Sequence, residues 1–145
     1  VINGALEAIY GDPLKYSEAQ LIVRPFPQHG NNLQELWEQY RQRMISLAGI
    51  ALFFFGNKRD GDKLVNANGV RREFEIALAH HLLPIPVAAT GFMAEELWKE
   101  ISAELHKYYG GCQWVIPMVQ KLIDPKTPPG EMVKTITDII KQLNR

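Results

Sequence analysis

The stretch that decides the fold is Ile50–Asn57, which reads IALFFFGN. An uninterrupted apolar run closed by a glycine and an asparagine is typical of a central β-strand covered on both faces. Strands of this kind belong to parallel sheets, because helical connections then cover both sides of the sheet. The stretch therefore predicts an α/β fold with a parallel sheet flanked by helices.

Two helices and one further strand are predicted upstream. Apolar residues recur at helical spacing over residues 1–9, and Gly11–Pro13 ends that helix. Gln20–Arg24 is short, rich in Leu, Ile and Val and followed by a proline, which predicts a strand. An amphipathic helix follows over residues 33–48, with Asn32 at its N-cap position.

Strand and helix patterns alternate again downstream of the stretch. The predicted elements are, in order, a polar loop (Lys58–Asn68), a helix (70–81), a strand (Pro84–Ala88), a turn and helix cap (Thr90–Gly91), a helix (94–108) and a last helix (132–143). Ligands of such sheets gather at the carboxyl ends of the strands, so the loops after Arg24, Phe55 and Val87 are the places to expect a site.

Composition excludes several classes of protein. The chain has 145 residues, 16 Lys+Arg against 16 Asp+Glu and 46% hydrophobic residues, which fits one globular domain over residues 1–145. Zero net charge argues against nucleic acid as a partner. A single cysteine favours a reducing, cytoplasmic compartment, and no apolar run is long enough to suggest a membrane partner. A first residue other than methionine suggests a fragment of a longer chain.

The candidate site combines small residues, a cation and an acid around the decisive strand. Gly56, Asn57 and Lys58 come at its carboxyl end, and Gly69 and Glu73 come in the first turns of the next helix. Glycine permits close backbone approach to a phosphate, and a carboxylate can accept the hydroxyls of a ribose. The alternative is a glycine turn, a solvated lysine and a surface glutamate.

Arg41 and Arg43 lie on opposite flanks of the buried stripe of the helix before the decisive strand. An arginine at such an edge can direct its guanidinium at a phosphate. Helical phase does not choose between the two, and ordinary solvated arginines are the alternative.

Other chemistries lack support in the sequence. His80 and His81 have no further ligands at usable spacing, so no metal site is predicted, and no serine or Cys112 lies in a nucleophile motif, so no catalytic residue is predicted. The aromatic residues Phe53–Phe55, Trp98 and Trp114 are expected to pack the core, although a ring at a strand end could stack on a base.

Several strings resemble a known family when they are taken in order. They are YRxRMI (40–45), IALFFFGNK (50–58), NGVRREFEIA (68–77), IPVAATG (85–91) and ELW (96–98). Together they resemble the STALD or SLOG-type sensor domain of the Thoeris antiphage defence effector. That domain is a Rossmann-like module downstream of a sirtuin-type NAD-hydrolysing domain.

The resemblance implies a receptor without catalysis of its own or a cofactor. Its ligand would be a cyclic ADP-ribose isomer made by a TIR-domain partner, and binding would switch on the effector domain of the same chain. Arg41 and Lys58 would hold the pyrophosphate, Glu73 a ribose hydroxyl, and Gly56, Asn57 and Gly69 would shape the cradle. A homo-oligomer is expected by analogy. The family's first strand and glycine-rich turn are expected to be missing from these residues.

The alternative is an enzyme of the wider superfamily. The lysine-decarboxylase-like phosphoribohydrolases share a PGGxGTxxE signature, and Gly69–Glu73 is similar to its second half. Phe55–Asn57 replaces the first half, and a polar insert separates the parts. On this reading Glu73 would stabilise an oxocarbenium-like ribose or act as the acid-base group.

Overall fold

The computed structural model describes residues 2–23 and 25–145, which form two compact units, residues 1–40 and 41–145. The first unit contains α1 (Ile2–Gly11), the 3-10 turn η1 (Glu18–Gln20) and the first part of α2 (Leu33–Ile45). Within it, the indole of Trp37 donates to the carbonyl oxygen of Pro27 at 2.7 Å, and the rings of Phe26 and Tyr40 lie 5.8 Å apart. The loop before α2 is thereby held to that helix. The prediction of a single domain over residues 1–145 stays a prediction.

The predicted strand Gln20–Arg24 is wrong for the part that is described. Gln20 ends η1, residues 21–23 have no regular structure, and Arg24 lies outside the described residues. A strand needs a neighbour to pair its backbone, and Ile22 instead leaves 70% of its surface exposed. A short apolar run alone does not supply that neighbour. The two helices predicted around this segment are confirmed as α1 and α2.

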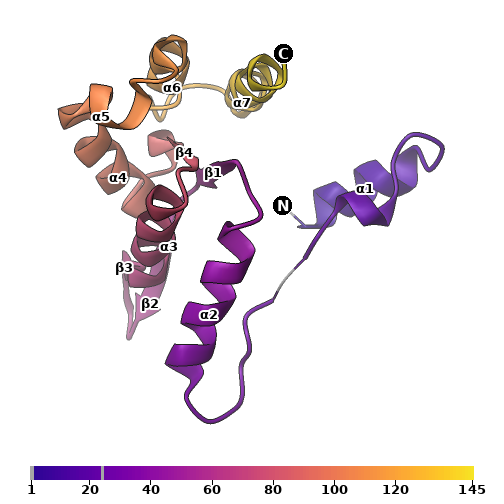
Figure 1. Cartoon of the computed structure of the whole chain (residues 1–145), viewed down its shortest axis with the longest axis vertical. Helices are drawn as coiled ribbons and strands as arrows, with labels where there is room; N and C mark the ends of the chain where they lie inside the picture. The colour runs from indigo at the N-terminus through magenta and orange to yellow at the C-terminus, as the bar shows by residue number, and fades with distance from the viewer. Residues whose placement is uncertain (1, 24) are drawn as a thin grey trace. The chain divides into compact units, whose positions relative to one another are not determined.

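The second unit is a mixed α/β structure (Figure 1). After the end of α2 its elements are β1 (Ile50–Phe53), β2 (Asn57–Asp60), β3 (Lys63–Asn66), α3 (Asn68–Ala79), β4 (Leu83–Pro86), η2 (Ala88–Thr90), α4 (Phe92–Ala103), α5 (Leu105–Tyr109), η3 (Gln113–Val115), α6 (Ile116–Gln120) and α7 (Pro129–Leu143). β1 and β4 pair in parallel, with Ile50 opposite Leu83 and Phe53 opposite Pro86. The predicted parallel sheet flanked by helices is confirmed for this pair of strands.

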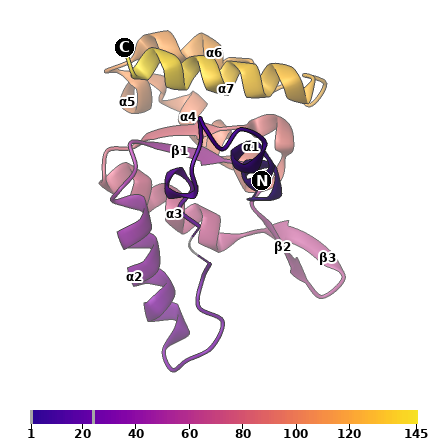
Figure 2. The same cartoon turned by 90° about the vertical axis from the view of Figure 1, so that its right-hand side faces the viewer.

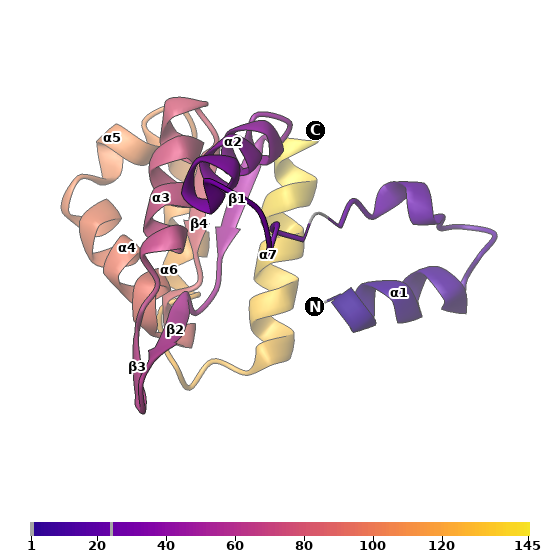
Figure 3. The same ribbon diagram turned by 90° about the horizontal axis from the view of Figure 1, so that it is seen from below.

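Helices cover both sides of this strand pair. Figure 3 shows α3 and α4 on one side of β1 and β4, and α7 on the other. The core between them is apolar and includes Phe74 of α3, Leu97 of α4 and Ile139 of α7, each at most 1% exposed. The hydroxyl of Tyr109 also lies inside that core, where it donates to the carbonyl oxygen of Pro84 at 2.9 Å and burial raises its pKa.

The predicted loop Lys58–Asn68 is largely a β-hairpin, and the loop prediction is wrong. β2 and β3 pair antiparallel, with Asp60 opposite Lys63, and the hairpin extends away from the helices (Figure 2). Gly61 has a φ of +60° at the first central position of the two-residue turn, as a type II′ turn requires. The polar composition concealed this turn signal because both faces of the hairpin are largely solvated.

The predicted helix over residues 94–108 is two helices. Glu104 has φ −139° and ψ 49°, which are not helical, and it separates α4 from α5. The last predicted helix is confirmed as α7. Among the described residues, no helix combines the length and apolar character that a membrane crossing needs.

Gly56 tests how tightly the carboxyl end of β1 is packed. A Cβ at this position would lie 2.7 Å from the Cβ of Met93, and φ is +78°. We expect Gly56→Ala to lower the free energy of unfolding by about 2–4 kcal/mol, from left-handed strain plus overpacking. Gly61→Ala is the matched control, because its φ is +60° but nothing lies within 4 Å, and it should cost about 1 kcal/mol. Equal losses in urea unfolding would contradict this packing.

Candidate functional site

The candidate site lies where β1 ends and α3 begins. Phe55 and Gly56 turn the chain out of the sheet with φ values of 52° and 78°. The carbonyl oxygen of Gly56 then accepts the N–H of Ala67 at 2.8 Å, which brings the residue before α3 to the end of β1. The strand end and the helix start are thus tied together across the intervening hairpin.

An ion pair joins α2 to α3 beside this turn. Arg41 Nε lies 3.3 Å from Glu73 Oε1, and the two side chains are only 16% and 26% exposed. A Cβ at Gly69 would lie 2.7 Å from Arg41 Nη2, so the guanidinium rests against the first turn of α3 and would have to move if Gly69 carried a side chain. The structure therefore brings together three of the predicted site residues, Arg41, Gly69 and Glu73.

Burial controls the electrostatics of Glu73. Desolvation raises the pKa of its carboxyl above the ordinary value, and the nearby Arg41 guanidinium opposes this rise without cancelling it. A carboxyl in this environment is more easily protonated than a surface glutamate. The protonation of the Glu73 carboxyl therefore depends on how far it is buried and on its distance from Arg41.

The structure separates the two arginines that helical phase left equivalent. Arg41 faces Glu73, whereas Arg43 is exposed, and its carbonyl oxygen accepts the hydroxyl of Ser46 at 3.0 Å. The geometry thus favours Arg41 as the arginine of the site.

The remaining predicted residues divide between the turn and the hairpin. Gly56 is buried at the end of β1, where it packs against Val70 and Met93. Asn57 and Lys58 are exposed on β2, opposite Asn66 and Val65 of β3. They are not part of the contacts described for Arg41 and Glu73, so the structure does not gather all six predicted residues at one point.

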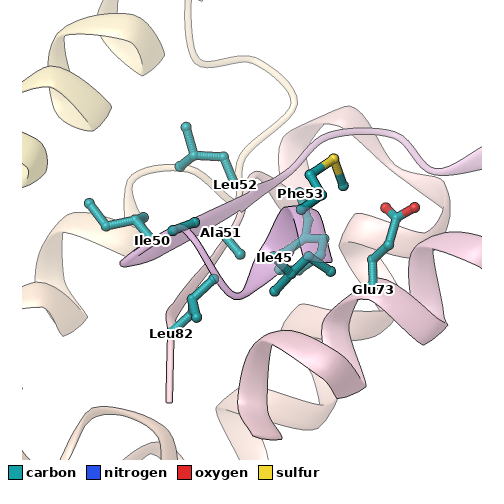
Figure 4. A pocket seen from close by; sticks show the side chains of 9 residues that line it. Ile45, Ile50, Ala51, Leu52, Phe53, Glu73 and Leu82 are labelled. Atoms are coloured by element: carbon teal, nitrogen blue, oxygen red, sulfur yellow. The ribbon is translucent and has the colours of Figure 1, made fainter. Parts of the chain in front are cut away.

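A pocket of about 210 Å³ adjoins Glu73 on the side of α2 and β1. Figure 4 shows the carboxylate of Glu73 at one side of it, while the other labelled side chains are apolar. Its lining includes all four residues of β1, Ile50–Phe53. Successive side chains of a strand point to opposite faces, so a pocket that touches all of them lies along the edge of the strand.

Sequence reasoning missed the role of Thr90 and misplaced two aromatic rings. Thr90 Oγ1 accepts the N–H of Phe55 and donates to the carbonyl oxygen of Val87, both at 2.7 Å. Of the predicted turn and cap Thr90–Gly91, Gly91 is confirmed as the N-cap residue of α4. Phe53 packs the core, but Phe54 and Phe55 are 42% and 53% exposed, so the packing prediction is wrong for these two rings. Within residues 2–23 and 25–145, no group of three or more His, Cys, Asp or Glu side chains is placed to hold a metal ion.

The family profile described as the Sir2- and TIR-associating SLOG family, STALD, matches residues 1–143. The chain belongs to the STALD family. The resemblance found from the motifs is confirmed, and the mixed α/β structure agrees with an SLOG fold.

Similar proteins from several bacteria carry the name NAD(+) hydrolase ThsA. The one from Cytobacillus dafuensis is 47% identical over 112 residues, which cover 75% of this chain and 23% of that protein. Those from Bacillus cereus strain MSX-D12 and Acinetobacter baumannii strain 532279 are 35% and 32% identical and cover 99% and 97% of this STALD chain. The chain spans 30% and 31% of their lengths. It therefore corresponds to less than a third of each relative.

The raised pKa of Glu73 predicts a specific dependence of stability on pH. Because the folded state binds this proton more tightly than the unfolded state, the stabilisation is complete below the ordinary glutamate pKa of about 4.3 and is lost as pH rises through the raised value. We expect the unfolding free energy of the wild type minus that of Glu73→Gln to fall as the pH rises above the ordinary glutamate pKa of about 4.3. Urea unfolding at a series of pH values measures it. A difference that stays constant or grows with pH would show that Arg41 outweighs burial.

Proposed function

We propose that this STALD chain is a regulatory nucleotide-binding domain without a cofactor or catalysis of its own. It senses a cyclic ADP-ribose isomer made by a TIR-domain partner and activates a linked NAD-hydrolysing effector in antiphage defence. The observation that carries the proposal is the half-buried pair of Arg41 and Glu73 beside the carboxyl end of β1. The names of the family and of the relatives support the connection to TIR proteins and to NAD hydrolysis.

Each site residue has a part in this proposal. Arg41 and Lys58 hold the pyrophosphate, and Glu73 accepts a ribose hydroxyl. Gly56, Asn57 and Gly69 shape the cradle. The guanidinium has five N–H donors in a planar fork, so Arg41 can bond a phosphate while it remains near Glu73. Lys58 sits on an exposed strand of the hairpin and adds a cation that reaches the ligand from the solvent side.

The signal passes to the effector as a shift between two states of the protein. A ligand moves such an equilibrium only by its difference in affinity for the two states, and each tenfold of activation requires about 1.4 kcal/mol of that difference. The proposal includes a homo-oligomer, because contacts that form only in the assembled state would provide the difference in affinity. The cytoplasm is the proposed location.

Among the described residues β1 pairs with β4 alone, and a further strand along its other edge would complete the sheet. The 210 Å³ pocket that follows this edge is lined by apolar side chains such as Ile45, Leu52 and Leu82, which suits an extended apolar segment. We place there the first strand of the family, followed by its glycine-rich turn. This strand would leave the turn at the carboxyl end of the sheet, next to Arg41 and Glu73.

The raised pKa of Glu73 also favours a second candidate, a phosphoribohydrolase that cleaves nucleoside monophosphates. A carboxyl that holds its proton more readily is suited to act as a general acid. This reaction releases a free base, whereas a sensor leaves its ligand intact. Chromatography of nucleoside monophosphates incubated with the protein distinguishes the two functions.

Calorimetric titration with cyclic ADP-ribose isomers, ADP-ribose and NAD tests the sensor proposal. We expect one cyclic isomer to bind tightly. Arg41→Ala should lower the affinity for this isomer about tenfold to a hundredfold, because charge-assisted hydrogen bonds are lost. Arg43→Ala is the matched control on the same helix and should leave the affinity unchanged. Binding of none of these ligands, or equal affinity in both variants, would contradict the proposal.

Gly69→Ala should move stability and affinity in opposite directions. Alanine in a helix is favoured over glycine by about 0.5–1 kcal/mol, but its Cβ would displace Arg41 Nη2. We therefore expect unfolding to become no easier while affinity for the cyclic isomer falls. Gly130→Ala is the control, since Gly130 is also the second residue of its helix and has nothing within 4 Å. Unchanged affinity in Gly69→Ala would separate Gly69 from ligand binding.

A further inference from the structure

Phe55 carries an exposed aromatic ring on a left-handed backbone at the carboxyl end of β1. Its φ is 52°, a conformation that a bulky side chain rarely adopts, and 53% of its surface is exposed. Phe53, two residues earlier, is buried and packs edge-on against Phe74 with ring centroids 5.7 Å apart. Packing in the core therefore explains Phe53 but not Phe55.

The backbone of Phe55 is fixed on both sides. Its N–H donates to Thr90 Oγ1 at 2.7 Å, and its carbonyl oxygen accepts the N–H of Ala94 at 3.0 Å. Thr90 in turn donates to the carbonyl oxygen of Val87, the residue after β4. The turns at the ends of both strands thus hold one residue in an unfavourable conformation. Strain that the surroundings maintain in this way is concentrated at functional sites.

The fixed residue is connected to the polar part of the candidate site through Gly56 and Val70. Gly56 follows Phe55 directly, and a Cβ there would lie 3.1 Å from Val70 Cγ1. Val70 follows Gly69, which lies against the guanidinium of Arg41. A chain of neighbouring residues therefore leads from the exposed ring to the group proposed to hold the pyrophosphate.

We propose that Phe55 is a stacking surface for the nucleobase of the ligand and that Thr90 is the residue that positions it. This inference rests on the proposed nucleotide-sensing function and adds the part of the site that recognises the base. Every base presents a flat π-face, which stacks on an exposed aromatic ring without hydrogen bonds. Polar contacts at Arg41 and Glu73 would recognise phosphate and ribose, and the ring would supply the affinity that depends on the base.

Titration of the protein with cyclic ADP-ribose isomers and with ribose 5-phosphate, which lacks a base, tests the proposal. We expect Phe55→Ala to lower the affinity for the cyclic isomer about tenfold or more. Phe55→Trp should restore that affinity. Neither variant should change the weaker affinity for ribose 5-phosphate. Phe54→Ala, which removes the neighbouring exposed ring, is the matched control and should bind both ligands as the wild type does.

Stability separates stacking from a structural role. Phe55→Gly removes the ring and the left-handed strain together, so we expect the protein to unfold no more easily while it loses affinity for the cyclic isomer. Loss of affinity only in variants that are also destabilised would overturn the proposal. In Phe55→Trp, quenching of the added indole by the cyclic isomer, over the signal of the wild type, would support direct stacking, and no added quenching would contradict it.

The positioning role of Thr90 is also tested by comparing ligands with and without a base. Thr90→Val removes the hydroxyl that holds Phe55, and Thr90→Ser keeps it, so only the first should reduce affinity for the cyclic isomer more than for ribose 5-phosphate. Two failures are distinguishable. If the wild type binds none of the nucleotides, the proposed function is wrong and the stacking role with it. If Arg41→Ala loses binding but Phe55→Ala does not, only the stacking role is wrong.

Discussion

Parallel pairing of β1 and β4 determines where the functional groups of residues 41–145 can lie. With Phe53 opposite Pro86, both strands end at the same edge of the sheet. The turns that follow are then close enough for Thr90 to bond Phe55. The hairpin of β2 and β3 separately brings the N–H of Ala67, the residue before α3, to the carbonyl oxygen of Gly56. A shift of this register would separate these turns and remove the site without changing any of its side chains.

The pair of Arg41 and Glu73 is expected to add little to stability. Taking two charges largely out of water costs free energy that their attraction often fails to recover, and apolar side chains could join α2 to α3 as well. The raised pKa of Glu73 shows that desolvation exceeds the attraction at this carboxyl. A half-buried ion pair that adds little to the free energy of folding could be replaced by hydrogen bonds to a ligand with a small loss of stability.

The sequence allowed the fold class to be predicted because its clearest patterns lie in elements that pack against the apolar core. The apolar run at Ile50–Phe55 contains β1, and the apolar stripe over residues 132–143 lies on α7. The prediction of a strand at residues 20–24 was wrong because a strand requires a pairing partner, which the sequence of the segment does not specify. The hairpin was not predicted because Asp60-Gly61 lies between polar strands, in which the alternation of apolar and polar residues is weak.

For the site, residue type could be predicted and orientation could not. Glycines and charges at a strand end indicated the place, yet only coordinates distinguish Arg41 from Arg43, which differ by half a helical turn. The same holds for Thr90, whose neighbour Gly91 is the signal of a turn but does not indicate which backbone group a hydroxyl will meet. Tertiary contacts across 32 and 35 residues of sequence decide both cases.

Several unfavourable features of the structure lie together at the carboxyl edge of the sheet. Phe55 and Gly56 adopt left-handed backbone there, at about 1–3 kcal/mol for a residue such as phenylalanine, and Glu73 holds its charge in a desolvated position nearby. In the core formed by α4–α7, the buried side chains among the described residues are apolar apart from the tyrosine hydroxyl, which has its hydrogen-bond partner. A protein of marginal stability retains such local costs where they are offset elsewhere. The apolar packing of the helical part of the second unit thus offsets the strain and the desolvated charge at the carboxyl edge.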